Sequence, residues 1–401
     1  MPAATSLADL AGRRPRLVLL GLAAGVALAF QGSRGLYETT EGRYAQSALE
    51  MVQRGRYLEP TLSGRPHWTK PPMAYWAIAA GIHVAGPNGW GARLANAVAF
   101  CLTVLLVAGI GAALWDRETG LLAGLVYLSS IFPAAAASAL SADTLVAFLE
   151  VAAVYLFVRA WRAPAPERAR GLVRGMWIAW GLAFMTKGPA ALLPLLAILA
   201  VRRLSARRVP LADPLGLAAF ALVAFSWFVV VGVRHPGLLS YYLGDEVVGR
   251  IVSNEFKRNP QWWKPFVIYL PALVLGQGLW LAAAARIPRA AGIGSARALW
   301  ARVRRGDGAA FLLLWLALPL AVFWLSSSRL PLYVLPLYAP IALAIGRALA
   351  RDRSEAPVPR ALRIAIPTAL VLVLLKGVAA HALPPSEKDM AALNALTLRE
   401  G

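Results

Sequence analysis

Apolar runs long enough to cross a lipid bilayer recur along almost the whole chain, and they decide what it can fold into. A hydrocarbon layer of about 30 Å requires about 20 apolar residues in a helix. Backbone polar groups inside lipid must be satisfied within the spanning structure, which favours helices for runs of this length. The prediction is an all-α polytopic membrane protein, a bundle of about 11 transmembrane helices at residues 17–31, 89–114, 119–134, 139–160, 172–186, 188–203, 211–233, 265–285, 308–325, 330–349 and 361–382.

The charges alternate between successive connections in a way that fixes an orientation. The chain is 59% hydrophobic and 15% charged, and its 41 Lys and Arg outnumber 20 Asp and Glu. More than half of the basic residues fall in one alternating set of loops, as positive-inside topology requires. The net charge of +21 therefore indicates topology rather than a nucleic-acid partner. We expect a retained first span, a cytoplasmic N-terminus and no intrachain disulfide, because Cys101 is the single cysteine.

This topology leaves two long loops on the outer side, at about 32–88 and 234–264. In the first loop, apolar residues recur with helical period from Tyr44 to Val52, which predicts an amphipathic helix along the membrane surface. Thr40 suits its N-cap and Gly55 its exit. We expect amphipathic surface helices in both outer loops, one transmembrane domain over residues 1–382, and a short outer tail over 383–401 without a separate soluble domain.

Acidic side chains gather at the predicted outer ends of the spans. Carboxylates at membrane level are costly, which makes them candidates for function. Simpler explanations stay open: Glu41 suits a helix start with Arg43 as partner, and Asp143 suits an N-cap. Glu150 lies seven residues after Asp143, on roughly the same helical face. The acids at this face are Glu38, Glu41, Asp143, Asp245 and Glu246.

Basic side chains on the same face run against the charge rule that governs the rest of the chain. A phosphate at headgroup depth would offset their cost, because Arg offers a bidentate fork and Lys a point charge. Contact with lipid headgroups, or pairing with the acids, also explains any single one. Prolines near Lys70 and Lys187 fix the local backbone, which favours the phosphate interpretation. The set is Arg43, Lys70, Lys187, Arg234, Arg250, Lys257, Arg258 and Arg329.

Other chemistries leave no recognisable pattern. The 4 histidines show no metal-ligand spacing such as HExxH. There is no glycine loop of the kind that cradles nucleotide phosphates, and no Gly-x-Ser-x-Gly nucleophile motif. We therefore expect no cofactor, and the spacing does not support a divalent metal.

Several segments, taken in order, resemble one known family. TTEGRYAQSALEMVQRGRYLEPTLSGRPHWTKPPMAYW (39–76) is similar to the first periplasmic loop of the aminoarabinose transferase and protein mannosyltransferase superfamily, membrane glycosyltransferases of the GT-C class. Further matches are SADTLVAF (141–148), TKGPAALL (186–193), RHPGLLSYYLGDEVVGRI (234–251) and SSSRLPLYVLPLYAP (326–340). The resemblance spans residues 17 to about 349 and is nearest to the bacterial aminoarabinose-transferase-like branch.

The resemblance implies inverting transfer of a sugar from a polyprenyl-phosphate donor at the outer side of the membrane. It places the family's loop acid and the following Arg-Tyr on Glu41, Arg43 and Tyr44. It places the donor-phosphate lysine of Lys-Pro-Pro on Lys70. The family's second acid, its Lys-Gly-Pro lysine, its loop arginine and its Leu-Pro-x-Tyr tyrosine fall on Asp143, Lys187, Arg250 and Tyr333.

The chain departs from the family pattern at three positions. Thr40 stands where aminoarabinose transferases typically have an aspartate before the loop glutamate. Thr69 replaces a glutamate before Lys-Pro-Pro, and Val247 replaces a histidine of the second loop. The last two positions resemble a metal pair in some relatives, so their replacement argues against a bound ion. Full-length relatives carry a further C-terminal outer domain, whereas this chain stops soon after HALPPSEKDM.

The sequence thus predicts a glycosyltransferase of the bacterial cytoplasmic (inner) membrane, with its active site facing outward. We expect Glu41 as general base with Asp143 as the second candidate. Predicted donor-phosphate contacts are Arg43, Lys70, Arg250, Lys187 and Arg329; predicted substrate contacts are Tyr44, Tyr333 and Glu38. The partners are a polyprenyl-phosphate sugar donor, the bilayer and an unidentified acceptor. The alternatives are a transporter of a polyprenyl-linked or anionic lipid substrate, and an accessory scaffold with a decayed site.

Overall fold

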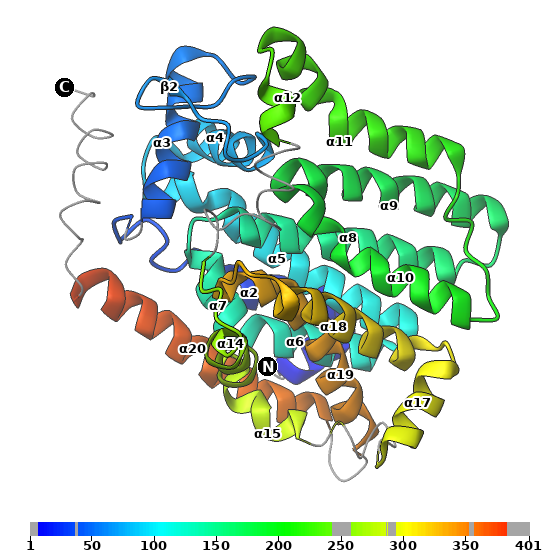
Figure 1. Cartoon of the computed structure of the whole chain (residues 1–401). Helices are drawn as coiled ribbons and strands as arrows, with labels where there is room; N and C mark the ends of the chain where they lie inside the picture. The colour runs from blue at the N-terminus through cyan, green and yellow to red at the C-terminus, as the bar shows by residue number, and fades with distance from the viewer. Residues whose placement is uncertain are drawn as a thin grey trace.

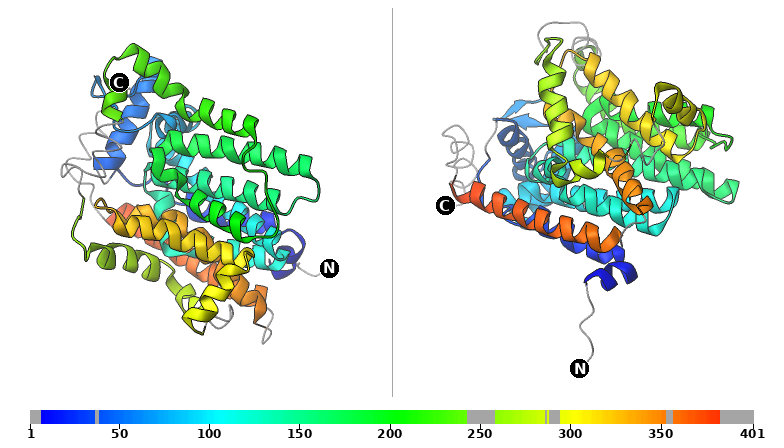
Figure 2. Two further views of the ribbon diagram at one scale, coloured as in Figure 1. Left: turned by 45° about the vertical axis from the view of Figure 1, so that its right-hand side comes forward. Right: turned by 90° about the horizontal axis from the view of Figure 1, so that it is seen from below.

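Helices make up nearly all of the described structure and run side by side in a bundle (Figures 1 and 2). The computed structural model describes residues 7–36, 39–242, 258–285, 287, 294–352 and 357–382. Its N-terminal half holds α1 (Leu7–Arg13), α2 (Pro15–Leu28), α3 (Thr39–Arg54), β1 (Thr61–Leu62), β2 (Arg65–Pro66), α4 (Met73–Ala85), α5 (Gly89–Leu114), α6 (Arg117–Ser129), α7 (Ile131–Ser138), α8 (Ala142–Trp161) and α9 (Pro166–Lys187). The remainder holds η1 (Gly188–Leu192), α10 (Leu193–Leu204), α11 (Pro214–Arg234), α12 (Leu238–Tyr241), α14 (Lys264–Leu275), η3 (Gly278–Trp280), α15 (Leu281–Ala284), α17 (Ala296–Arg304), α18 (Gly308–Leu325), η4 (Pro331–Leu337), α19 (Tyr338–Arg351) and α20 (Pro357–Ala382).

The helices are long and apolar enough to make this a multi-pass membrane protein. Within the described residues, seven helical segments could cross a bilayer, or up to nine if each of two bent pairs counts as a span. Large apolar side chains on α11 and α20 are exposed, including Leu222, Val233 and Leu374, as a surface facing lipid requires. The all-α polytopic fold is confirmed. The predicted count of about 11 is not confirmed.

The stretch from Pro166 to Leu204 is one of these segments, but the chain turns back within it. Arg207, just beyond α10, donates to the carbonyl of Ala163, which precedes α9. Trp161 donates to the Ser205 hydroxyl at 3.3 Å, at the same end. The end of α10 therefore lies beside the start of α9, and η1 forms the reversal. The predicted division into two spans near residue 187 agrees with these contacts.

The predicted span at residues 265–285 is bent rather than one continuous helix. Here α14 and the η3–α15 helix meet at 90°. Gly276 at the bend touches the chain opposite: a Cβ there would lie 2.0 Å from the Tyr338 hydroxyl, and its carbonyl accepts from Phe132 N at 3.1 Å. Gly278 follows with φ of 59°, a conformation that favours glycine. Only glycine leaves room for this close contact with Tyr338. The apolar run therefore bends at a point where its periodicity alone indicates a continuous helix.

One end of the bundle carries α3, the β1–β2 hairpin and α4, and we call it the loop end (upper left in Figure 1). The predicted helix of the first loop is present as α3, and Gly55 ends it with φ of 62°. Thr40 lies inside the helix rather than at its N-cap. The apolar stripe of α3 packs on Ile78 and Ile82 of α4, so this face of the amphipathic helix contacts protein.

The β1–β2 hairpin was not predicted, and Glu50 of α3 holds its turn. The buried carboxylate accepts hydrogen bonds from the amides of Ser63 at 2.7 Å and Gly64 at 3.2 Å. Thr61 donates to the same carboxylate from β1. Burial raises the pKa of Glu50, but these donors outweigh burial and hold it below its ordinary value. A two-residue strand pair is therefore fixed by a side chain from a neighbouring helix.

The first loop is docked onto the end of α11. Trp227 donates to the Leu58 carbonyl at 2.7 Å, and Tyr242 donates to the Trp68 carbonyl at 2.7 Å. The Trp68 ring also lies 5.2 Å from the ring of His235. The second predicted surface helix falls largely on residues 243–257, and the predicted tail on 383–401; both lie outside the described residues.

Candidate active site

The first turn of α8 presents Asp143 at the loop end. Ser141 and Asp143 both suit the N-cap by sequence, and the structure assigns the cap to Ser141, whose hydroxyl accepts from Asp143 N at 3.2 Å. The Asp143 carboxylate is not used for capping. It pairs instead with the ammonium of Lys187 at the end of α9.

Lys187 lies between this carboxylate and an aromatic ring. Its Nζ is 4.4 Å from the centre of the Tyr333 ring, which η4 supplies. A cation over the face of a tyrosine is attracted by the ring quadrupole. Lys187 and Tyr333 come from separate sequence motifs, and the structure brings them together beside Asp143.

Tyr44 of α3 joins this group from the first loop. It interacts electrostatically with Asp143 and Tyr333, and its ring is 5.3 Å from that of Tyr75. Burial, with Tyr75 and Asp143 nearby, raises the pKa of Tyr44, so its hydroxyl stays protonated at neutral pH. We call Asp143, Lys187, Tyr333 and Tyr44 the Asp143 cluster.

Two predicted phosphate-binding cations adjoin the Asp143 cluster. Arg43 interacts with Tyr44, and both Arg43 and Lys70 interact with His67. Burial first, and then these two cations, lower the pKa of His67 and keep its imidazole neutral at pH 7. The loop end therefore concentrates positive charge beside Asp143.

Glu41 of α3 lies in a different environment, in contact with Leu140, which is three residues before Asp143 in the chain. The Arg34 guanidinium binds both of its oxygens, at 2.7 and 2.9 Å, and Arg93 donates to Oε2 at 3.1 Å. The Leu140 amide donates to Oε1 at 2.6 Å. Burial raises the pKa of Glu41, but Arg34 and Arg93 outweigh it and hold the pKa below its ordinary value. We call Glu41, Arg34, Arg93 and the Leu140 amide the Glu41 anchor.

Arg329 is also engaged with protein. Its guanidinium donates to the carbonyls of Asn259 at 2.8 Å, Gln261 at 3.1 Å and Trp324 at 3.1 Å. These contacts tie the segment before α14 to the end of α18. The remaining predicted site residues, Arg250 and Glu38, lie outside the described residues.

A metal pair of the kind that the family resemblance raises does not fit the donors present. Thr69 stands at one of the two positions, and its hydroxyl contacts His67 Nε2 at 2.9 Å. The described part of the chain holds no group of three or more His, Cys, Asp or Glu that could bind an ion.

Sequence reasoning missed the residues that support the site. Arg93 is fully buried within the apolar α5, and a charged residue inside an apolar run is a signal that could have singled it out. Arg34 and Tyr75 have no such signal, because their roles depend on α3, α4 and α5 meeting at the loop end.

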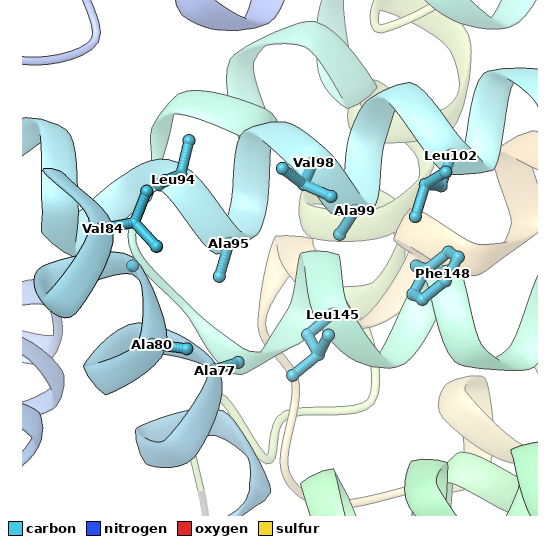
Figure 3. Close-up of a pocket in the computed structure, with 11 residues that line it drawn as sticks. Ala77, Ala80, Val84, Leu94, Ala95, Val98, Ala99, Leu102, Leu145 and Phe148 are labelled. Atoms are coloured by element: carbon cyan, nitrogen blue, oxygen red, sulfur yellow. The ribbon is translucent and has the colours of Figure 1, made fainter.

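An apolar groove of about 300 Å³ lies between α4, α5 and α8 (Figure 3). Phe148 and Leu102 lie at one end of it. Leu145 of α8 also lines the groove, and because residues two apart in a helix point to nearly opposite sides, this is not the side of α8 that carries Asp143. Nearly all of the lining is hydrocarbon, which suits a lipid chain rather than a polar ligand.

Comparison with known proteins agrees with these observations. Residues 69–232 match the family of dolichyl-phosphate-mannose-protein mannosyltransferases. The chain is 34% identical over 352 residues to an undecaprenyl phosphate-alpha-4-amino-4-deoxy-L-arabinose arabinosyl transferase of Pseudomonas fluorescens, covering 86% of this chain and 61% of that protein. A Pectobacterium carotovorum protein of the same description is 31% identical over 81% of this chain and 57% of its own length. The chain thus spans less than two thirds of these curated relatives.

Solved structures extend the comparison to the fold. ArnT from Cupriavidus metallidurans, in a crystal structure bound to undecaprenyl phosphate, superposes with a TM-score of 0.74 at 23% identity, covering 95% of this chain and 68% of that one. An Archaeoglobus fulgidus oligosaccharyltransferase tethered to an acceptor peptide gives 0.55 at 14% identity, covering 97% of this chain and 56% of that one. The predicted resemblance is therefore confirmed: this multi-pass membrane protein is related to the aminoarabinose transferases and protein mannosyltransferases and has the ArnT fold.

Proposed function

We propose that the protein transfers a sugar from a polyprenyl-phosphate donor to an acceptor hydroxyl, with inversion, at the outer face of the bacterial cytoplasmic membrane. The observation that carries the proposal is the Asp143 cluster together with Arg43 and Lys70, and the apolar groove between α4, α5 and α8 adds to it. A polyprenyl-phosphate sugar needs both a cationic site and an apolar one. The names of the relatives support this substrate class.

The chemistry requires one bond to form as another breaks. The acceptor oxygen attacks the anomeric carbon from the side opposite the phosphate, so the configuration inverts. The bond between that carbon and the phosphate oxygen breaks, and its electron pair leaves with the polyprenyl phosphate. Arg43, Lys70 and Lys187 meet the charge that develops on the leaving oxygens, joined by Arg250 of the second loop.

Asp143 accepts the proton of the acceptor hydroxyl in this scheme. The contacts favour it over Glu41, because Glu41 already accepts from four donors and its pKa is lowered. Glu41 instead fixes the chain at Leu140, directly before α8, and so positions Asp143. Tyr44 and Tyr333 line the sugar site, and Arg329 holds the second loop in place.

The test is to incubate the purified protein in nanodiscs with a panel of polyprenyl-phosphate sugars and to follow the release of polyprenyl phosphate. Asp143→Asn serves as the inactive reference. A matched control is Asp213→Asn, since Asp213 also lies at a helix start and pairs with a basic residue of α9, Arg174, but away from Lys187 at the end of that helix. Donor that is moved across a membrane without being consumed would overturn the proposal in favour of a transporter.

A further inference from the structure

Helix α17 lies at the end of the bundle opposite the loop end (lower right in Figure 1). With 3.6 residues per turn, Leu299, Trp300 and Val303 leave one side of this helix, and its arginines leave the other sides. Trp300 is 63% exposed, and Leu299 is exposed beside it. The apolar face of α17 is therefore largely open to its surroundings.

Positive charge surrounds this apolar face. Residues 294–306 hold four arginines and no Asp or Glu. Arg302 turns toward the protein, where it pairs at 3.3 Å with Asp307, the N-cap of α18. The other three arginines are exposed. We call Arg297, Leu299, Trp300, Arg304 and Arg305 the α17 patch.

The end of α10 extends the same surface. Gly306 follows α17 with φ of 60°, and a Cβ there would lie 2.5 Å from the carbonyl carbon of Leu204, the last residue of α10. The side chains of Leu204 and Arg203 are both exposed. Two helix ends thus present apolar and basic side chains together.

The connection to α18 keeps the α17 patch near the membrane. Residues 305–307 join α17 to α18, which is long and apolar enough to cross a bilayer. Three residues span about 10 Å at most, so α17 lies close to the point where α18 leaves the hydrocarbon. A helix with an apolar face and a basic polar face lies in the plane of the membrane interface, and tryptophan is enriched at that depth.

We propose that the α17 patch binds the anionic headgroups of the membrane leaflet at this end, which is the cytoplasmic leaflet in the predicted topology. Trp300 and Leu299 enter the boundary between headgroups and acyl chains. The exposed arginines bind lipid phosphates, which match the fork of a guanidinium. Anionic lipid is preferred because a zwitterionic headgroup carries a positive charge of its own and offers no net attraction. The inference is independent of the proposed sugar transfer.

Hydrogen exchange of the α17 amides tests the proposal directly. A nine-residue helix is marginal in water by itself, so slow exchange reports a surface that holds it. The full-length protein is placed, one copy per nanodisc, in phosphatidylcholine alone or mixed with phosphatidylglycerol, and exchange of residues 296–304 is read by mass spectrometry. We expect several-fold slower exchange in the anionic discs. Equal exchange in the two kinds of disc overturns the proposal.

Charge variants locate the effect. Replacing the three arginines of the α17 patch by Gln should abolish the difference between the discs, and replacing them by Lys should retain it. The matched control replaces Arg54, Arg56 and Arg65 by Gln, which removes three exposed arginines at the loop end and should leave the difference unchanged. A control that abolishes the difference would assign it to net charge and contradict a site at α17.

Salt and the apolar side chains separate the two parts of the contact. In about 1 M salt the Debye length falls to about 3 Å, so the difference between the discs should shrink. Trp300→Ser should speed exchange in both kinds of disc, whereas Leu325→Ser, at the other end of α18, should not. Protection of α17 that appears only in discs holding two copies would make this face an interface between copies and overturn the proposal.

Discussion

The Glu41 anchor and the Asp143 cluster lie at the same end of the bundle and treat a carboxylate in opposite ways. Glu41 accepts four hydrogen bonds, from two arginines and a backbone amide. Among the described residues, Asp143 forms an ion pair with Lys187, whose ammonium also lies over the Tyr333 ring. A carboxylate saturated with donors holds a backbone in place, whereas one with a single cation retains lone pairs for a substrate proton. Under the proposed function, the number of donors on each acid distinguishes the residue that fixes the backbone from the residue that accepts the proton.

The substitution Asp143→Asn tests the difference between the two carboxylates most directly. Removing the base should lower the transfer rate by about 10²- to 10⁴-fold. The thermal unfolding midpoint should fall less than in Glu41→Gln, because the Asp143–Lys187 pair is partly exposed whereas the Glu41–Arg93 pair is buried. The measurement is polyprenyl phosphate release under single-turnover conditions, with Asp213→Asn as the control. A fully active Asp143→Asn protein would remove this residue from the mechanism.

Glu41→Gln should show the opposite pattern. Taking the charge from a buried pair leaves Arg93 and Arg34 without their counter-ion, which costs about 3–5 kcal/mol. The measurement is the thermal unfolding midpoint in detergent, beside that of the exposed Glu118→Gln. If Glu41→Gln is as stable as the wild type yet binds donor without turning it over, Glu41 is the base and the comparison is reversed.

Tyr333→Leu tests the aromatic side of the Asp143 cluster. Loss of the ring beneath Lys187 should raise the donor KM by up to about tenfold, the upper range of a partly buried cation–π contact, and Tyr333→Phe should have a smaller effect. Tyr155→Leu is a matched control, because its ring lies 5.6 Å from the Arg159 guanidinium away from the cluster. Equal KM values for Tyr333→Leu and Tyr333→Phe would contradict a role for the ring.

Of these substitutions, Glu50→Gln should change stability least, and the change should depend on pH. Its folded-state pKa is below the ordinary value of 4.5, so its stabilising contribution is present above that pH and is lost as the pH falls through the folded value. Glu50→Gln should therefore destabilise by about 1 kcal/mol at neutral pH and progressively less in acid. Unfolding midpoints of both proteins across acidic pH check this. A difference that grows on acidification has the wrong sign for this contact.

Sequence alone identified the elements whose signals are local. The apolar runs gave α5, α8 and α11 closely, and the helical stripe with Gly55 gave α3. Asp143, Lys187, Tyr333 and Tyr44 came from separate motifs, and the structure brings them together. Their roles stay predictions until they are tested.

The rest depends on contacts between segments that no local pattern encodes. The 90° bend after α14 exists because Gly276 meets Tyr338 and Phe132 from other helices. The hairpin turn depends on Glu50, whose partners lie more than ten residues ahead. The partners of Glu41 are likewise distant, since Arg93 belongs to α5 and Leu140 precedes α8. Sequence reasoning assigned Arg43 as the neighbour of Glu41 because only residues close in the chain were visible.

The two helix ends at which Asp143 and Lys187 lie also contribute to the electrostatic field of the site. Asp143 lies in the first turn of α8 and Lys187 is the last residue of α9, so each charge sits at the helix end whose peptide dipoles favour it. The peptide groups of two antiparallel helices therefore support the separation of charge at this site, and no side-chain substitution removes them. A variant stripped of its site cations should retain a residual field from the start of α8 that attracts an anion.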